Sequence, residues 1–107
     1  MKRYGSVINL KPEAVLAYTQ LHAHGWEQVL AKITECNIRN YSIYLYGNTL
    51  FSYFEYVGDD YEADMAKMGE DEVTQAWWSV CKPLQSPAPE AKPGEWWHDI
   101  DEVFHLD

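Results

Sequence analysis

The strongest structural signal in this chain is NYSIYLYGNTLFSYFEY, residues 40–56. Isoleucine, tyrosine and phenylalanine are frequent in the two segments that make up most of this stretch, 37–46 and 50–57. Such β-branched and aromatic residues favour strands. The two segments flank Gly47-Asn48, and this pair between two strand-like runs is typical of a tight hairpin turn. We therefore predict an antiparallel β-hairpin in the middle of the chain.

Strand and helix patterns alternate on either side of this hairpin. Apolar residues recur at helical spacing from Glu13 to Cys36, and Gly25 is expected to bend or divide that helix. Asp60 is a suitable N-cap for a helix after the hairpin, and Gly69 is expected to separate it from the next helix. The remaining expected elements are a strand at 3–10, helices at 61–68 and 71–81, and a short last strand at 102–106.

The resulting order of elements, β-α-β-β-α-β, is that of the ferredoxin-like split βαβ plan, an α+β fold. A length of 107 residues suits one domain over residues 1–107. Segment 82–95 holds four of the five prolines and is expected to be a long irregular crossing loop before the last strand.

Both faces of the expected sheet carry large apolar side chains. Tyr41, Ile43 and Leu45 alternate with Ser42 and two further tyrosines along one strand, so neither face is polar. One chain supplies helices for only one face, and a second copy of the sheet would cover the other in a two-fold homodimer that forms a dimeric α/β barrel. Alternatively, the proline-rich loop with Trp96 and Trp97 covers that face. In a variant that is compatible with the dimer, the loop crosses to the partner subunit.

Charge and composition exclude several classes of partner. The chain has 17 acidic and 8 basic residues, a net charge of −9, which disfavours nucleic acid and anionic membranes. It has no apolar run long enough for a membrane span and no expected signal peptide. Two cysteines make no disulfide framework, so Cys36 and Cys81 are expected to be reduced thiols of a cytoplasmic protein.

Tyr18 and His22 are the first candidates for chemistry. They lie four residues apart on a predicted helix and therefore project side by side. A histidine on such a face is either a hydrogen-bonded core residue or a proton donor and acceptor, and the pattern leaves both open. His24 lies two residues after His22, and side chains at this spacing point to different sides of a helix. No metal site is therefore expected at these two histidines.

Pairs of tryptophans supply the second set of candidates. Trp77 and Trp78 are adjacent on a predicted helix, so one ring can pack in the core while the other lines a cleft. Trp96, Trp97 and His98 follow the proline-rich loop, where they either close a pocket or pack against a partner chain.

Taken in order, these pieces resemble the L-rhamnose mutarotase family over nearly the whole chain. The resemblance rests on Tyr18-x-x-x-His22, Trp26, NYSIYL at 40–45, Leu50-Phe51, Glu55, Trp77-Trp78 and EVFHLD at 102–107. It implies a cytoplasmic, cofactor-free homodimer of ferredoxin-like subunits that interconverts the α and β anomers of a 6-deoxy-hexose. By the same resemblance His22 is the proton donor, and Tyr18, Tyr41, Trp77 and Trp78 contact the sugar.

The chain departs from the family pattern at residues 21–27, next to His22, where the pocket mouth is expected. The departure bears on the sugar, and L-fucose is the alternative substrate to L-rhamnose. Two other classes remain as alternatives: a haem-binding or quinol-type monooxygenase of the same fold, and a non-catalytic sugar-binding dimer.

Anomer exchange needs one proton taken from the anomeric hydroxyl and one given to the ring oxygen. We expect His22 to protonate the ring oxygen or the anomeric oxygen, while Tyr18 or Tyr41 orients the sugar or shares the proton relay. A tryptophan would stack on the apolar face of the sugar. These side chains can converge if the sheet face that carries Tyr41 is the one covered by helices, with a pocket between the two layers.

Overall fold

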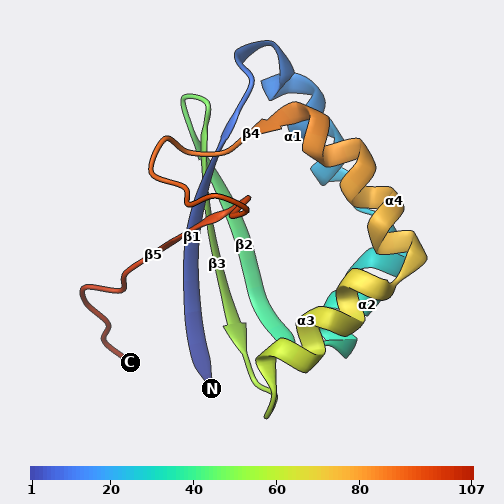
Figure 1. Ribbon diagram of the computed structural model, residues 1–107, viewed down its shortest axis with the longest axis vertical. Helices are drawn as coiled ribbons and strands as arrows, with labels where there is room; N and C mark the ends of the chain where they lie inside the picture. The colour runs from blue at the N-terminus through green and yellow to red at the C-terminus, as the bar shows by residue number, and fades with distance from the viewer.

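The computed structural model describes all 107 residues as an antiparallel sheet covered by helices on one side (Figure 1). Strands follow the order β2-β3-β1-β4, and β5 also pairs with β1. The strands are β1 (Lys2–Leu10), β2 (Ile38–Tyr46), β3 (Thr49–Tyr56), β4 (Gln85–Ser86) and β5 (His98–Ile100). The helices are η1 (Pro12–Ala14), α1 (Val15–Ala23), α2 (Glu27–Glu35), α3 (Tyr61–Glu70), α4 (Glu72–Cys81) and η2 (Lys82–Leu84). The predicted α+β plan is confirmed, with β1 between the hairpin and the last strands.

The predicted hairpin is confirmed, with its turn at Gly47-Asn48. Tyr46 pairs with Thr49, and Gly47 takes a φ of 62°, a left-handed conformation that costs glycine little. Farther along, the register shifts between Arg39 and Ser42 because β2 contains one extra residue there. The hairpin is therefore regular at its tip and bulged at its base.

The helices divide almost where the sequence predicts. α1 ends at Ala23 and α2 begins at Glu27, on either side of Gly25. Asp60 caps α3 by accepting a hydrogen bond from the Ala63 backbone N–H at 3.1 Å. The expectation that Gly69 separates α3 from α4 is wrong: Asp71 does so, because its extended backbone ends α3 while its carboxylate caps α4 by accepting from the Thr74 N–H.

The predicted last strand at 102–106 is also wrong. The strand that closes the sheet is β5, which pairs with β1 from Gly5 to Val7, while residues 101–107 form an exposed tail. Alternating apolar residues suggested a strand, but after β5 the tail leaves the edge of β1 and finds no strand to pair with. Its start is held by an ion pair, in which the Arg3 Nε donates to the Glu102 carboxylate at 2.9 Å.

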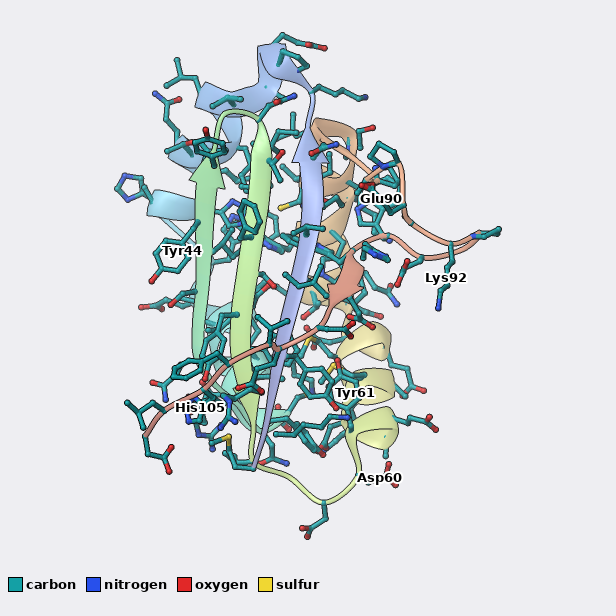
Figure 2. All side chains as sticks on the ribbon, turned by 90° about the vertical axis from the view of Figure 1, so that its left-hand side faces the viewer. Tyr44, Asp60, Tyr61, Glu90, Lys92 and His105 are labelled. Atoms are coloured by element: carbon teal, nitrogen blue, oxygen red, sulfur yellow. The ribbon has the colours of Figure 1, made fainter.

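The core lies between the sheet and the helices. Its buried members are Ile8, Leu10 and Leu50 from the sheet, and Tyr18, Val29, Trp77 and Cys81 from the helices. The opposite, outer face of the sheet has no helix over it, and the tail crosses part of it (Figure 2). Tyr44 stands on that face 67% exposed. Cys36 and Cys81 are both buried, free thiols, and no helix is long and apolar enough to cross a membrane.

Candidate active site

A cavity of about 700 Å³ separates the inner face of the sheet from the helices. Its walls are mainly apolar, and it is of the size that holds small organic ligands. All five tryptophans of the chain line it: Trp26, Trp77, Trp78, Trp96 and Trp97. Tyr18, His22 and Tyr41 also line it, so the structure brings together every site residue that the sequence predicts.

His22 reaches the cavity from α1 with a defined hydrogen-bond polarity. Its Nδ1 lies 3.1 Å from the carbonyl oxygen of Tyr18. A carbonyl only accepts, so Nδ1 carries the hydrogen and Nε2 of the neutral ring keeps a free lone pair. Burial lowers the pKa of His22, against the opposing effect of this backbone hydrogen bond. The ring is therefore neutral at pH 7 and offers Nε2 as a proton acceptor.

Aromatic packing holds the imidazole of His22 in place. The Tyr18 ring stacks on it with centroids 4.0 Å apart, and Trp77 packs against it in a T-shaped arrangement with centroids 5.0 Å apart. Trp26 packs in turn on Trp77 at 5.1 Å. Because neighbours on two sides restrict rotation of the ring, the direction of Nε2 is set before any ligand enters.

Tyr18 is buried, and its hydroxyl takes part in a short polar chain. The Gln85 side-chain amide donates to the Tyr18 hydroxyl oxygen at 3.2 Å, and the Trp96 indole N–H donates to the Gln85 carbonyl oxygen at 2.7 Å. Burial raises the pKa of Tyr18, although the hydrogen bond from Gln85 opposes that shift. Tyr18 is therefore a neutral phenol at pH 7.

The bulge in β2 turns Tyr41 into the cavity. In a regular strand Tyr41 would face the side opposite to Ile38, but the extra residue puts both on the inner face. Asn40, with a φ of 51°, occupies the bulge, and its amide donates to Glu55 at 2.7 Å. Asparagine tolerates this left-handed backbone, so the Asn40–Glu55 pair positions Tyr41.

Tyr41 itself is 43% exposed because it faces the cavity, where water reaches it. The protein around its hydroxyl raises the pKa of Tyr41 to about 12 through desolvation. It therefore stays protonated at pH 7 and can hydrogen-bond a ligand. Its strand neighbour Ile43 also lines the cavity, as predicted for the helix-covered face.

Trp77 and Trp78 line the cavity together. Trp77 is only 9% exposed and belongs to the core, whereas Trp78 is half-buried beneath the ammonium of Lys82, 5.5 Å from its ring centroid. One ring in the core and one along a cleft was the expectation, but both reach the cavity. Lys82 also lies 5.8 Å from the ring of Trp96.

The segment after the proline-rich loop contributes to the helix-covered side. Trp96 and Trp97 line the cavity, so the alternative in which they cover the outer face of the sheet is wrong. His98 pairs in register with Val7 and bonds to Glu95 at 2.8 Å outside the cavity, whereas Asp99 lines it. Alternation along β5 explains the difference, because successive side chains point to opposite faces.

Sequence reasoning missed Gln85, Asp99 and the pair of serines in the cavity wall. Ser6 and Ser52 are opposite each other in β1 and β3, and their hydroxyls lie 2.8 Å apart. Small polar residues at inward positions of adjacent strands were a usable signal once the register was known. Gln85 carried no such signal, because it sits in a proline-rich stretch without periodicity.

Glu95 holds the end of the proline-rich loop and gives it a dependence on pH. Its carboxylate accepts hydrogen bonds from His98 Nδ1 and from the Lys92 backbone N–H at 2.9 Å, and these lower the pKa of Glu95 to about 2. A depressed pKa in the folded state stabilises the fold above the ordinary value of 4.5, and this contribution is lost as the pH falls toward 2.

We therefore expect Glu95→Gln to have a lower urea midpoint of unfolding than the wild type at pH 6. The difference between the two midpoints should shrink as the pH is lowered from 4.5 toward 2. Tryptophan fluorescence reports the transition, because Trp96 and Trp97 follow Glu95 directly. Glu90→Gln is the matched control, since Glu90 is exposed on the same loop (Figure 2). An equal deficit at every pH would contradict the assignment.

The family model for L-rhamnose mutarotase matches residues 3–106. The chain belongs to the L-rhamnose mutarotase family. An L-rhamnose mutarotase of Oceanobacillus iheyensis is 33% identical over 109 residues and covers 100% of both chains. That of Bacillus subtilis is 32% identical, again over 100% of both.

Two solved structures share the fold of this member of the mutarotase family. The crystal structure of the L-rhamnose mutarotase FA22100 from Formosa agariphila aligns with a TM-score of 0.77 at 20% identity over 100% of both chains. Tetracenomycin F2 cyclase from Streptomyces glaucescens, a type-II polyketide cyclase, aligns with 0.68 at 11% identity over 100% of both. A fold shared by such different proteins does not define the reaction, which has to come from the site.

Proposed function

We propose that this protein interconverts the α and β anomers of L-rhamnose, as an isomerase that uses side chains alone. The observation that carries the proposal is the placement of His22 and Tyr18 at one cavity with opposite hydrogen-bond polarity. His22 offers a lone pair, and Tyr18 offers a hydroxyl. Opening a hemiacetal needs one acceptor and one donor, and the family membership of the chain supports this reaction over the monooxygenase class.

The steps balance with these two groups. His22 Nε2 takes the proton of the anomeric hydroxyl, the bond from C1 to the ring oxygen breaks, and the Tyr18 hydroxyl gives its proton to the ring oxygen. The open-chain aldehyde then rotates about its C1–C2 bond. On closure the ring oxygen attacks the other face of C1, its proton returns to Tyr18, and His22 protonates the new anomeric oxygen. His22 thus accepts a proton first and donates it second.

The contact between the two rings favours this exchange. After the first step the pair holds an imidazolium and a phenolate, and the ring centroids of His22 and Tyr18 are 4.0 Å apart. Opposite charges at such a distance stabilise one another, which offsets the burial that raises the pKa of Tyr18 in the resting site.

The remaining lining suits a deoxy sugar. The indoles of Trp77 and Trp78 supply flat apolar surfaces for the sugar ring face and its methyl group. The Tyr41 hydroxyl, neutral at pH 7, can orient a sugar hydroxyl at the cavity wall. Of the residues that depart from the family pattern, Gly25 lines the cavity, Leu21 packs against the core, and Ala23, His24 and Glu27 are exposed, so most of them lie outside the expected pocket mouth.

NMR saturation transfer between the anomeric protons of a sugar tests the proposal. We expect the α and β anomers of bound L-rhamnose to exchange at least about 100-fold faster than the free sugar does spontaneously in water. L-Fucose is the competing substrate, and D-glucose is the negative control. A protein that binds these sugars, as seen by quenching of tryptophan fluorescence, without accelerating any exchange would be a sugar-binding protein, and the proposal would be refuted.

We further propose that two copies pair through the outer faces of their sheets, in the cytoplasm, where both buried thiols stay reduced. The support is the amount of exposed apolar surface on one side of the chain. Tyr44 and Phe51 are exposed on the outer face, and the tail exposes Val103 at 95% and Phe104 at 78%. Exposed apolar surface of this kind is typical of an interface between subunits.

Light scattering should then give twice the 12.5 kDa mass of one chain. Tyr44→Glu should shift the protein toward the monomer, because two carboxylates would be buried at the two-fold interface. Leu16→Glu is the control: Leu16 is 69% exposed on the helical side, so its variant should keep the mass of the wild type. A wild-type mass of one chain at micromolar concentration would rule the dimer out.

A further inference from the structure

Gln85 connects two aromatic residues that reach it from distant parts of the chain. It lies in β4, pairs in register with Leu10 and is buried. Its carbonyl oxygen is 2.7 Å from the Trp96 indole nitrogen, and its amide nitrogen is 3.2 Å from the Tyr18 hydroxyl. No buried side-chain nitrogen or oxygen in the chain lacks a partner, so each polar atom of this short relay makes at least one hydrogen bond.

Chemistry alone sets the direction of this relay. An indole N–H can only donate, so the group that faces Trp96 must be the carbonyl oxygen of Gln85. The amide NH₂ of Gln85 then faces Tyr18 and can only donate to it. The Tyr18 oxygen is thereby made an acceptor on this side, and its own hydrogen has to point to another acceptor.

We propose that Gln85 is a positioning residue that directs the Tyr18 hydroxyl proton into the cavity, toward the ring oxygen of the sugar. The inference rests on the proposed function, and it adds the reason why the Tyr18 hydroxyl is oriented as a hydrogen-bond donor toward the sugar. Without Gln85 the hydroxyl could turn toward the space that the amide fills. With Gln85 in place the donor is oriented before the sugar arrives, which removes a reorganisation step from the reaction.

Gln85→Glu reverses the relay in a defined way. A carboxylate still accepts from the Trp96 indole, but it also accepts from Tyr18 and so draws the hydroxyl proton away from the cavity. A protonated carboxyl group has one accepting oxygen and one O–H donor, the same polarity as the amide. Activity lost at neutral pH should therefore return as the introduced carboxyl group is protonated.

Other titratable groups around this site would also move the pH profile. They are Tyr4 from β1, His22 and Tyr18 from α1, Tyr41 from β2, Tyr61 from α3, Cys81 from α4, Lys82 from η2 and Asp99 from β5. All are present in both proteins, so the ratio of variant to wild-type kcat at each pH isolates the introduced carboxyl group to first order.

The experiment measures kcat and KM for L-rhamnose exchange from pH 4.5 to 8. For Gln85→Glu we expect kcat about 100-fold below wild type at pH 8, KM changed by less than about threefold, and a ratio that rises at low pH. Gln85→Met, which has no donor to protonate, should lose about tenfold with a flat ratio. Gln28→Glu, the same change at an exposed position of α2, should behave as wild type.

A double mutant separates positioning from a general structural effect. If Gln85 acts through Tyr18, Gln85→Glu should lower kcat no further in a Tyr18→Phe background, because no hydroxyl is left to direct. Equal, pH-independent losses in both Gln85 variants, or additive losses in the double mutant, would overturn the proposal. Trp96→Phe provides an independent variant if those at Gln85 do not fold: freed from the indole, the amide can turn over, and kcat should fall with little change in KM.

Failure of the proposed function would look different. It would show as wild-type protein that accelerates no sugar at all. In that case the Trp96 indole N–H resonance, assigned by its loss in Trp96→Phe, still tests the relay. It should stay hydrogen-bonded in Gln85→Glu and move upfield in Gln85→Met; an unchanged resonance in both would contradict the relay itself.

Discussion

Replacing His22 with alanine is expected to lower kcat for anomer exchange by about 10²–10⁴-fold, the usual contribution of a positioned acid-base group. His22 is the cavity group whose lone pair is free at neutral pH, because its Nδ1 hydrogen is held by the Tyr18 carbonyl. The variant removes that acceptor but leaves the sugar-contacting indoles, so KM should change far less than kcat. Saturation transfer on L-rhamnose measures the loss.

His24→Ala is the matched control, since His24 lies two residues away, is exposed and does not line the cavity. Thermal unfolding of both variants checks that the fold is intact. Free imidazole should restore part of the activity of His22→Ala by entering the space left by the ring, and should do nothing for the wild type. A folded His22→Ala protein with the wild-type rate would remove His22 from the mechanism.

The wild-type pH profile carries the same assignment. The proton-accepting form of His22 is the neutral ring, so activity falls as the ring is protonated on the acid side. Because burial lowers the pKa of His22, that fall should lie below the ordinary histidine value of 6.5. In the His22→Ala variant this limb should be absent.

Tyr18→Phe is expected to lower kcat by about 10²–10³-fold, the typical effect of removing one donor to a developing oxyanion. The phenyl ring keeps the stacking on His22, so the loss isolates the hydroxyl, which the structure orients through Gln85. A variant that retains the wild-type kcat would show that Tyr18 only packs against His22.

Tyr41→Phe distinguishes the two tyrosines. Tyr41 sits on the cavity wall across from α1 without a fixed hydrogen-bond partner, so its loss should act on KM more than on kcat. Tyr44→Phe is the control for both, because Tyr44 stands on the outer face of the sheet. If Tyr41→Phe instead showed the larger loss of kcat, the donor to the ring oxygen would be Tyr41.

Local patterns predicted most of the fold because each depends on residues close together in the chain. The glycine at the hairpin tip and the Asp60 cap each act on residues close to them in the chain. The same holds for Tyr18 and His22, which one helical turn brings side by side wherever the helix packs.

The two wrong predictions, the strand at 102–106 and the break at Gly69, concern features that depend on contacts which the local pattern does not specify. The tail at 102–106 alternates like a strand, but a strand exists only if a neighbour pairs with it, and that neighbour is set by the whole sheet. Gly69 looked like a break, yet the cap at Asp71 ends α3 instead. The tail lacked a strand to pair with, whereas at Gly69 the Asp71 cap outweighed the local preference.

Helical spacing, turn residues and the ordered motif were thus enough to predict the α+β plan, the family and the pair of Tyr18 with His22. Packing in three dimensions alone placed Gln85 between Tyr18 and Trp96, residues separated by most of the chain. It also turned Tyr41 inward through a one-residue bulge. The physical reason is range: preferences of the backbone act over a few residues, whereas the direction of a hydroxyl proton depends on donors and acceptors that only folding brings within hydrogen-bonding distance of one another.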